Sequence, residues 1–278
     1  MPEDIHGAPK LEEATRNVKT RGGLPASCVS GSVHTGACVT NCAADKMGLQ
    51  DSTKTLRWLE LALVTGVAFA GPVYFSFYYF LGGPTGPSDP SQHAYGVITE
   101  LLGLSVLIYV LFRQGRQAAD IGLSFQRRDI PRALAIAIVG YAAFYACYLL
   151  VYYGCYAVAG VQLTTPELGA RVFGLRFHWV IVLLLLVNPF FEELIVRAYL
   201  MTEIKFLTGS TAAAIAASVG LQTLYHLYQG LLLALAEAGL FLVFALYFSR
   251  WQRIMPLALA HLLFDLLSWS QYLWTGED

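Results

Sequence analysis

The sequence predicts an all-α protein, a polytopic bundle of about seven transmembrane helices with a cytoplasmic N-terminus. Of its 278 residues, 56% are hydrophobic and only 13% are charged, and the mean hydropathy is +0.54. A soluble domain carries about 25% charged residues. Apolar runs long enough to cross the hydrocarbon core, about 18–25 residues each, recur from Trp58 almost to the C-terminus.

Residues 1–52 are polar, with scattered Gly, Ser, Thr and charged residues, and the sequence predicts a disordered cytoplasmic tail there. His34, Cys38 and Cys42 follow one another at spacings of four and could hold a metal ion on a helix. The Gly, Ser and Thr content argues against a helix, so incidental thiols are the favoured interpretation. Met47 is a second candidate start beside Met1.

The remaining residues, 53–278, form the predicted transmembrane domain. Seven segments within it have the length and apolar content of membrane spans. They are Trp58–Leu81, Ala94–Phe112, Ala133–Ala157, His178–Leu200 and beyond, Ala212–Tyr228, Leu231–Phe248 and Ile254–Leu273.

Loops rich in basic residues alternate along the chain with loops that have few, and this alternation predicts the orientation of the protein in the membrane. Lys54 and Arg57 precede the first span, residues 82–93 contain no Lys or Arg, and residues 113–132 contain five arginines. Cytoplasmic loops carry an excess of Lys and Arg. We therefore expect the N-terminus in the cytoplasm, the C-terminus outside, and the segment Gln117–Arg128 along the cytoplasmic face.

The bulk charge and the cysteines exclude other classes of protein. The net charge of −1 gives no reason to expect a nucleic-acid partner. The cysteines are odd in number and two of them lie in apolar segments, which is unlike a secreted disulfide framework. They are Cys28, Cys38, Cys42, Cys147 and Cys155. No signal-peptide pattern opens the chain.

The fourth span carries charges at a costly position. Glu192, Glu193 and Arg197 follow a purely apolar run and precede further apolar residues. A charged residue in mid-membrane costs about 2.5–3.5 kcal/mol on insertion scales, so such residues face partners or a wet cavity and indicate function. Glu193 and Arg197, four apart, can pair on one helix face. Pro189 should bend the helix just before the acids, and Glu192 is left unpaired.

Two later spans each carry a histidine at a matching depth. His226 lies in the fifth span, one turn after Gln222, and His261 lies in the seventh, four residues before Asp265. Asp265 could accept a hydrogen bond from one ring nitrogen of His261 and leave the other nitrogen for substrate, water or metal. At about 1.5 Å per residue, all of these residues with Glu192 can meet near the middle of the membrane.

Two histidines beside a free carboxylate suit hydrolysis by an activated water. Glu192 could act as general base. His226 and His261 could hold a divalent metal such as zinc, or could donate hydrogen bonds to an oxyanion without metal. The sequence contains neither an H-E-x-x-H helix nor a G-x-S-x-G turn on these spans, so an activated water is favoured over a covalent serine mechanism.

The order of these motifs resembles one known family. The segment VNPFFEELIVR, then His226 in the next span, then His261-x-x-x-Asp265 are similar to the CPBP intramembrane proteases, also called Abi, which include the type II CAAX prenyl endopeptidases. The resemblance covers roughly residues 130–270. The chain departs from the family pattern at Gln222, where Phe is usual, at Ala198, where Gly is frequent, and at Asp265, where Asn is common.

The resemblance implies a membrane-embedded endopeptidase with its cavity open to the cytoplasm, in a bacterial-type cytoplasmic membrane. Its substrate would be a lipidated or membrane-associated protein or peptide, and membrane lipids would surround it. Glu192 would activate the water, and the remaining residues would shape the site. They are Glu193, Arg197, His226, His261 and Asp265.

Two other functions remain open at this point. One is a catalytically silent scaffold or bacteriocin-immunity factor of the same fold, for which the Gln222 departure leaves room. The other is a proton-coupled carrier, because Glu100 and Glu237 also lie within spans. We find no inverted repeats of the kind that many carriers contain.

Overall fold

The computed structural model describes residues 37–83, 86–160, 169–174 and 177–275. Of residues 37–52, 159 and 170 it describes only the backbone. The chain divides into two units, Met1–Gly48 and Leu49–Asp278, and the second contains the candidate site described below. His34 and the side chains of Cys38 and Cys42 lie outside the described residues, so the predicted metal-binding alternative in the tail stays a prediction.

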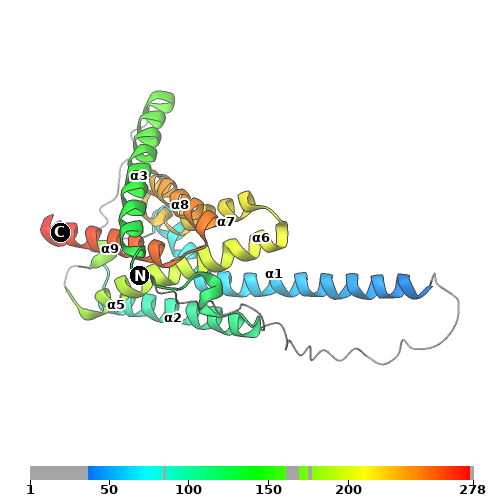
Figure 1. The fold of residues 1–278 in the computed structure, drawn as a ribbon. Coiled ribbons are helices and arrows are strands. Elements are labelled where there is room, and N and C mark those ends of the chain that lie inside the picture. The colour runs from blue at the N-terminus through cyan, green and yellow to red at the C-terminus, as the bar shows by residue number, and fades with distance from the viewer. Residues whose placement is uncertain (1–36, 84–85, 161–168, 175–176, 276–278) are drawn as a thin grey trace, which may run out of the picture. The chain divides into compact units, whose positions relative to one another are not determined.

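All seven predicted spans are helical, and the described residues contain no β-strand (Figure 1). The fourth span continues without a loop through three successive helical segments, α5, η2 and α6. The helices that correspond to the predicted spans are α1 (Ala37–Phe80), α2 (Pro90–Arg113), α3 (Asp129–Ala159), α5 (Trp179–Glu192), η2 (Glu193–Met201), α6 (Thr202–Thr208), α7 (Thr211–Tyr225), α8 (Leu231–Trp251) and α9 (Met255–Thr275). The shorter elements are η1 (Ala118–Ile121), α4 (Gly169–Phe173) and η3 (Leu227–Gln229).

Five of these helices are long and apolar enough to cross a membrane, which makes the chain an integral membrane protein with a polytopic helical bundle. These five lie at Thr53–Phe80, Pro90–Arg113, Asp129–Val158, Trp179–Thr208 and Leu231–Trp251. The other two predicted spans differ. Helix α7 has only 15 residues, and α9, although 21 residues long, carries His261, Asp265 and several other polar side chains.

The N-terminal boundary also differs from the expectation. Helix α1 begins at Ala37, so residues 37–52, predicted as part of a disordered tail, have helical backbone in the structure. This stretch contains Ala, Lys, Met, Leu and Gln, which are good helix formers, and it runs directly into the first span. Residues 1–36 lie outside the described residues.

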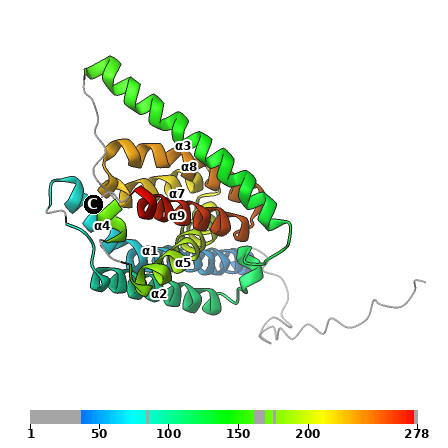
Figure 2. The same ribbon diagram turned by 90° about the vertical axis from the view of Figure 1, so that its left-hand side faces the viewer.

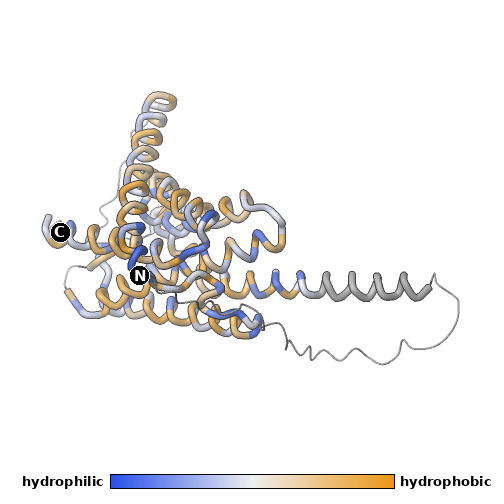
Figure 3. The backbone as a smooth tube through the Cα atoms, viewed as in Figure 1, coloured by the Kyte–Doolittle hydropathy of each residue, from blue (hydrophilic) through white to orange (hydrophobic). Residues whose placement is uncertain are grey.

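Hydrophobic residues run along most of the described helices, as the backbone coloured by hydropathy shows (Figure 3). On α2 and α3, large hydrophobic residues are more than half exposed, among them Ile98, Ile108, Phe112, Ile138 and Leu150. Exposed apolar surface of this extent is expected where lipid, and not water, is the solvent.

Packing between the helices places α5 and its continuation in the centre. Helix α2 packs against α5, α7 packs against η2 and α8, and α9 packs against α5. Helix α3 lies obliquely across α8 and α9 (Figure 2). Helix α1 contributes Phe69, whose ring lies 5.3 Å from the ring of Phe191 and 4.9 Å from the ring of Tyr225. The segment with the costly charges is therefore enclosed by α1, α2, α7, α8 and α9.

Ion pairs fasten the helix ends on the arginine-rich side. Buried Glu203 of α6 accepts hydrogen bonds from Arg57 of α1 at 2.8 and 2.9 Å and from Arg116 at 3.0 Å. Glu60 pairs with Arg113, and Asp129 accepts from Arg253 at 2.8 Å. At the opposite end, Asp89 caps α2 and accepts from the Ser91 hydroxyl at 2.6 Å and the Gln92 amide at 3.0 Å. These hydrogen bonds, that from Ser91 first, hold the pKa of the Asp89 carboxyl below its usual range.

Candidate active site

A π-helical segment holds the charged motif. Helix α5 ends at Glu192, and residues Glu193–Met201 form η2, which is a π-helix. Pro189, inside α5, removes one backbone donor just before this change. A π-helix pairs each carbonyl with the amide five residues on and is frequent at functional sites. The sequence predicts a bend here, and the structure shows a widened helix whose nine residues are all buried.

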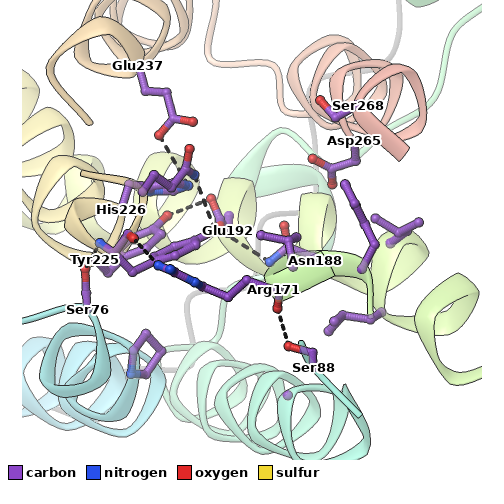
Figure 4. Close-up of a pocket in the computed structure, with 18 of the residues that line it drawn as sticks. Ser76, Ser88, Arg171, Asn188, Glu192, Tyr225, His226, Glu237, Asp265 and Ser268 are labelled. Carbon is purple, nitrogen blue, oxygen red and sulfur yellow. Dashed lines mark hydrogen bonds and ion pairs between the residues drawn. The ribbon is translucent and has the colours of Figure 1, made fainter. Parts of the chain in front are cut away.

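A cavity of about 1380 Å³ lies beside this segment. Residues of α1, α2, α3, α4, α5, α8 and α9 line it, together with the end of α7 and the turn that follows. Four carboxylates reach its wall: Glu100, Glu192, Glu237 and Asp265. Both predicted histidines, His226 (Figure 4) and His261, also line it. The structure therefore gathers side chains from α2, α5, α8, α9 and the α7 terminus at one concave surface.

Glu192 is the acid with the most contacts in the cavity. Its Oε2 accepts hydrogen bonds from the Tyr225 hydroxyl at 2.6 Å and from the Gln222 amide at 3.1 Å. Its Oε1 accepts from Asn188 at 3.2 Å. Nε2 of His261 lies 4.0 Å from Oε2. The carboxylate is thus fixed in direction by three neutral donors and faces one imidazole.

His261 is oriented by Glu193, not by Asp265. Nδ1 of His261 lies 3.1 Å from Oε1 of Glu193, whereas Oδ1 of Asp265 lies 3.7 Å from Nε2, beyond hydrogen-bond distance. This corrects the expected contact. Spacing within α9 brings Asp265 near Nε2 without a hydrogen bond, whereas Glu193 on the π-helix contacts Nδ1 at hydrogen-bond distance. Since a carboxylate accepts, Nδ1 carries the proton and Nε2 faces Glu192.

Glu193 and Arg197 lie behind the cavity wall. Both side chains are fully buried, and Nε of Arg197 lies 3.6 Å from Oε2 of Glu193, which confirms the predicted pair. The Arg197 guanidinium carbon lies 5.8 Å from the ring centres of both Phe241 and Phe244. Neither charged residue lines the cavity. Glu193 contacts His261 from behind this wall, and Arg197 pairs with Glu193.

His226 lies just past the end of α7, because this helix ends at Tyr225, three residues before the predicted end of the span. Its Nδ1 lies 2.8 Å from the backbone oxygen of Gln222. Its Nε2 lies 3.9 Å from Oε2 of Glu237 on α8. His226 and His261 therefore line the same cavity, His226 from the turn that follows α7 and His261 from α9, whereas the sequence placed His226 within the fifth span.

Three further residues line the cavity, and two of them follow from helix spacing. Asn188 lies four residues before Glu192 and also donates to Glu100 of α2 at 2.9 Å, so it joins the two carboxylates. Tyr225 lies three residues after Gln222 on α7 and reaches the same carboxylate oxygen. Arg171 also lines the cavity and donates to the backbone oxygen of Tyr228 at 3.3 Å. No spacing in the sequence connects Arg171 with the motifs.

The donor set does not fit a metal ion. Among the described residues, no three His, Cys, Asp or Glu side chains stand close enough together to hold one. Protein metal sites of zinc use three or four such ligands. We therefore derive no chemical step through a metal.

The match to a protein family falls on the part of the chain that carries the predicted site. Residues 174–267 match the model of the family described as Type II CAAX prenyl endopeptidase Rce1-like. This match confirms the resemblance on which the sequence interpretation rests, and it contains every residue of the predicted site, from Glu192 to Asp265. The comparisons with curated proteins and with solved structures found no match.

Residues 174–267 are thus similar to the type II CAAX prenyl endopeptidase Rce1-like family. The geometry adds what the segment can do chemically. A carboxylate, two imidazoles and a tyrosine hydroxyl surround a hollow large enough for a peptide segment. Glu100 and Glu237, on which a carrier function would depend, line this same cavity and do not form a separate path among the described residues.

Proposed function

We propose that the chain is an intramembrane endopeptidase that hydrolyses peptide bonds of membrane-associated or lipidated proteins or peptides. One observation carries the proposal. Glu192, on the wall of a cavity of about 1380 Å³, lies within 4.0 Å of an imidazole whose opposite nitrogen is held by a second carboxylate. Mid-membrane acids and histidines are costly, and their convergence on one cavity supports a shared chemical role.

In this proposal Glu192 draws the proton from a water molecule that attacks the scissile carbonyl carbon. A carboxylate at hydrogen-bond reach of water is a suitable general base. His261 presents Nε2 to the same region, because Nδ1 is occupied by Glu193. When Nε2 carries a proton, it can donate to the oxygen on which negative charge develops. Asn188, Gln222 and Tyr225 keep the Glu192 carboxylate in one orientation.

The lining of the cavity supports an apolar substrate. Aromatic residues of α1 and α3 face it, among them Phe75, Phe144, Tyr145 and Tyr148. Such residues bury large apolar area and would accommodate a lipid chain or an apolar peptide segment. This lining supports the lipidated or membrane-associated class of substrate that the family name suggests.

The experiment uses the full chain in detergent or lipid discs and an internally quenched, farnesylated peptide that ends in a C-a-a-X sequence. We expect cleavage by the unaltered chain and loss of cleavage in Glu192→Gln, which keeps the shape of the side chain. Glu60→Gln is the matched control, since Glu60 is a buried membrane carboxylate at the arginine-rich end, away from the cavity. Full activity of Glu192→Gln would overturn the proposal.

A second candidate, a catalytically silent scaffold or immunity factor, is favoured by one contact. Gln222 replaces the family's usual Phe, and its amide donates to Oε2 of Glu192 at 3.1 Å. With Tyr225 and Asn188, this leaves fewer lone pairs of the carboxylate to orient water. Complementation of a strain lacking the chain separates the two functions. Full complementation by both Glu192→Gln and His261→Ala would favour the silent scaffold.

The membrane orientation is a further part of the proposal. The excess of arginine at one end of the helices supports a cytoplasmic N-terminus. The cavity lining extends toward the opposite end, to Ser88 in the loop before α2 and to Thr275 at the end of α9. In this orientation that mouth lies on the non-cytoplasmic side, which is opposite to the cytoplasmic opening that the family resemblance implies.

A further inference from the structure

His226 has a carboxylate neighbour to which the proposed chemistry gives no role. Oε2 of Glu237 lies 3.9 Å from Nε2 of His226. Glu237 lines the cavity from α8, and its Oε2 is buried and accepts no hydrogen bond among the described residues. A buried carboxylate oxygen without a partner is costly, and each such atom in a native structure needs an explanation.

The other nitrogen of His226 decides which form of the ring fits this neighbour. Nδ1 lies 2.8 Å from the Gln222 carbonyl oxygen, which can only accept, so Nδ1 carries a proton. When Glu237 is ionised, a neutral ring would present the Nε2 lone pair to the carboxylate, and two acceptors would face each other. In the imidazolium, the protonated Nε2 instead lies at ion-pair distance, 3.9 Å, from the carboxylate.

Other carboxylates also lie near the ring of His226. The carboxylates of Glu192 and Asp265 also lie within electrostatic range of His226. Among the described residues that line the cavity, Arg171 is the single Arg or Lys, and the contact that it makes is to a backbone oxygen. The ring of His226 thus faces several acids at short range, with Glu237 nearest to Nε2.

We propose that Glu237 is a positioning residue that holds the Nε2 proton of His226, and that this proton is delivered to the leaving nitrogen of the substrate. The inference rests on the proposed peptidase function and deepens it. The two imidazoles then have different roles. His261, oriented by Glu193, serves the side of the attacking water and the oxyanion. His226, oriented by Gln222 and Glu237, serves the departing amine.

The step balances with water as the single co-reactant. Glu192 takes one proton from water, and the remaining hydroxyl bonds to the carbonyl carbon. The carbon–nitrogen bond then breaks, its electron pair stays on nitrogen, and this nitrogen takes the proton of His226 Nε2. The product acid ionises. Its proton and the proton on Glu192 complete the ammonium group and restore His226.

The test compares a scissile amide with a scissile ester in the same farnesylated C-a-a-X peptide, because an alkoxide leaves with far less help from an acid than an amine does. For Glu237→Gln we expect kcat on the amide to fall by about 10²-fold, a typical contribution of general acid catalysis, with KM unchanged. The kcat on the ester should fall much less. Glu237→Asp, which keeps the carboxylate, should recover part of the amide rate, and Glu60→Gln should leave the amide-to-ester ratio unchanged.

Equal losses on amide and ester, or no loss on the amide, would overturn the inference. A second measurement is independent of turnover: ¹⁵N spectra of the histidine-labelled chain, with the His226 signals assigned by their loss in His226→Gln. We expect protonated Nε2 in the unaltered chain and an unprotonated Nε2 in Glu237→Gln. A neutral ring in the unaltered chain refutes the inference, whereas failure to cleave either peptide refutes the proposed function for this substrate class.

Discussion

Oε1 of Glu193 lies 3.1 Å from Nδ1 of His261, although the two residues are 68 positions apart in the chain. This contact joins the π-helix to α9 and fixes which nitrogen of His261 faces Glu192. The second acid of the motif therefore acts on the imidazole, and the first acid faces the cavity.

Glu193→Gln tests this division of roles. The amide can still contact the ring, but it no longer favours a proton on Nδ1 specifically, so His261 would sample the wrong tautomer. We expect kcat to fall about 10–100-fold, the range typical for partners that orient a functional histidine, with KM unchanged. Steady-state cleavage of the farnesylated peptide measures both constants, and an unchanged kcat would contradict the role of Glu193.

Arg197→Met should destabilise the fold strongly. It removes one partner of a fully buried pair and leaves Glu193 charged and uncompensated, which costs about 3–5 kcal/mol. Thermal unfolding in detergent measures the loss. The double variant Glu193→Gln/Arg197→Met, which removes both charges, should be more stable than Arg197→Met alone. If the two losses simply add, the pair is not coupled as the 3.6 Å contact indicates.

Tyr225→Phe should affect activity more than stability. The substitution removes the 2.6 Å hydrogen bond to Glu192 but keeps the ring that stacks on Phe69 at 4.9 Å. A hydrogen bond to a charged group is worth about 1.5–3 kcal/mol, and the freed carboxylate would lose its fixed direction. We expect kcat to change at least tenfold with little change in unfolding temperature. A large drop in that temperature would assign Tyr225 a structural role.

Two glycines of the bundle differ in the space around them. A Cβ added at Gly103 would lie 2.8 Å from a ring carbon of Phe191 and 3.3 Å from Cβ of Ala68. We expect Gly103→Ala to cost about 1–3 kcal/mol through overpacking. At Gly66 a Cβ meets nothing within 4 Å, so Gly66→Ala should stabilise α1 by about 0.5–1 kcal/mol. Unfolding of both variants under the same conditions gives the comparison, and equal effects would contradict it.

The orientation of the cavity can be measured with single cysteines on a background without the native ones. Thr275→Cys lies on the cavity lining at the end of α9, and Gln126→Cys lies among the arginines before α3. We expect an impermeant maleimide applied to intact cells to label Thr275→Cys and not Gln126→Cys. The reverse result would place the mouth of the cavity in the cytoplasm, as the family resemblance implies.

Apolar length and the cost of buried charge were sufficient to predict the helices and the residues that meet. The seven segments are helical, and Glu192, His226 and His261 line one cavity. The contact partners within the site were less predictable. Spacing within one helix favoured Asp265 as the partner of His261, but the actual partner, Glu193, comes from a different helix. Sequence spacing gives neighbours on one helix, whereas the pairing between helices depends on their packing.

The sequence also did not predict where α7 ends or that Glu193–Met201 form a π-helix. Helix α7 ends at Tyr225, so His226 lies at a chain reversal that follows the helix and not within it. The residues Glu193–Met201 contain good helix formers, and propensity does not distinguish a π-helix from an α-helix.

The wide turns of η2 have a consequence for insertions and deletions. A π-helical hydrogen bond spans one residue more than an α-helical one, so deletion of a single residue between positions 194 and 196 would let this segment close into ordinary α-helix. Glu193 and Arg197 would then stand three positions apart, and residues three apart remain neighbours on one face of an α-helix. A one-residue deletion within the wide turns is therefore expected to keep the acid beside the guanidinium, whereas the same deletion within an α-helical segment would rotate the preceding residues by about 100°.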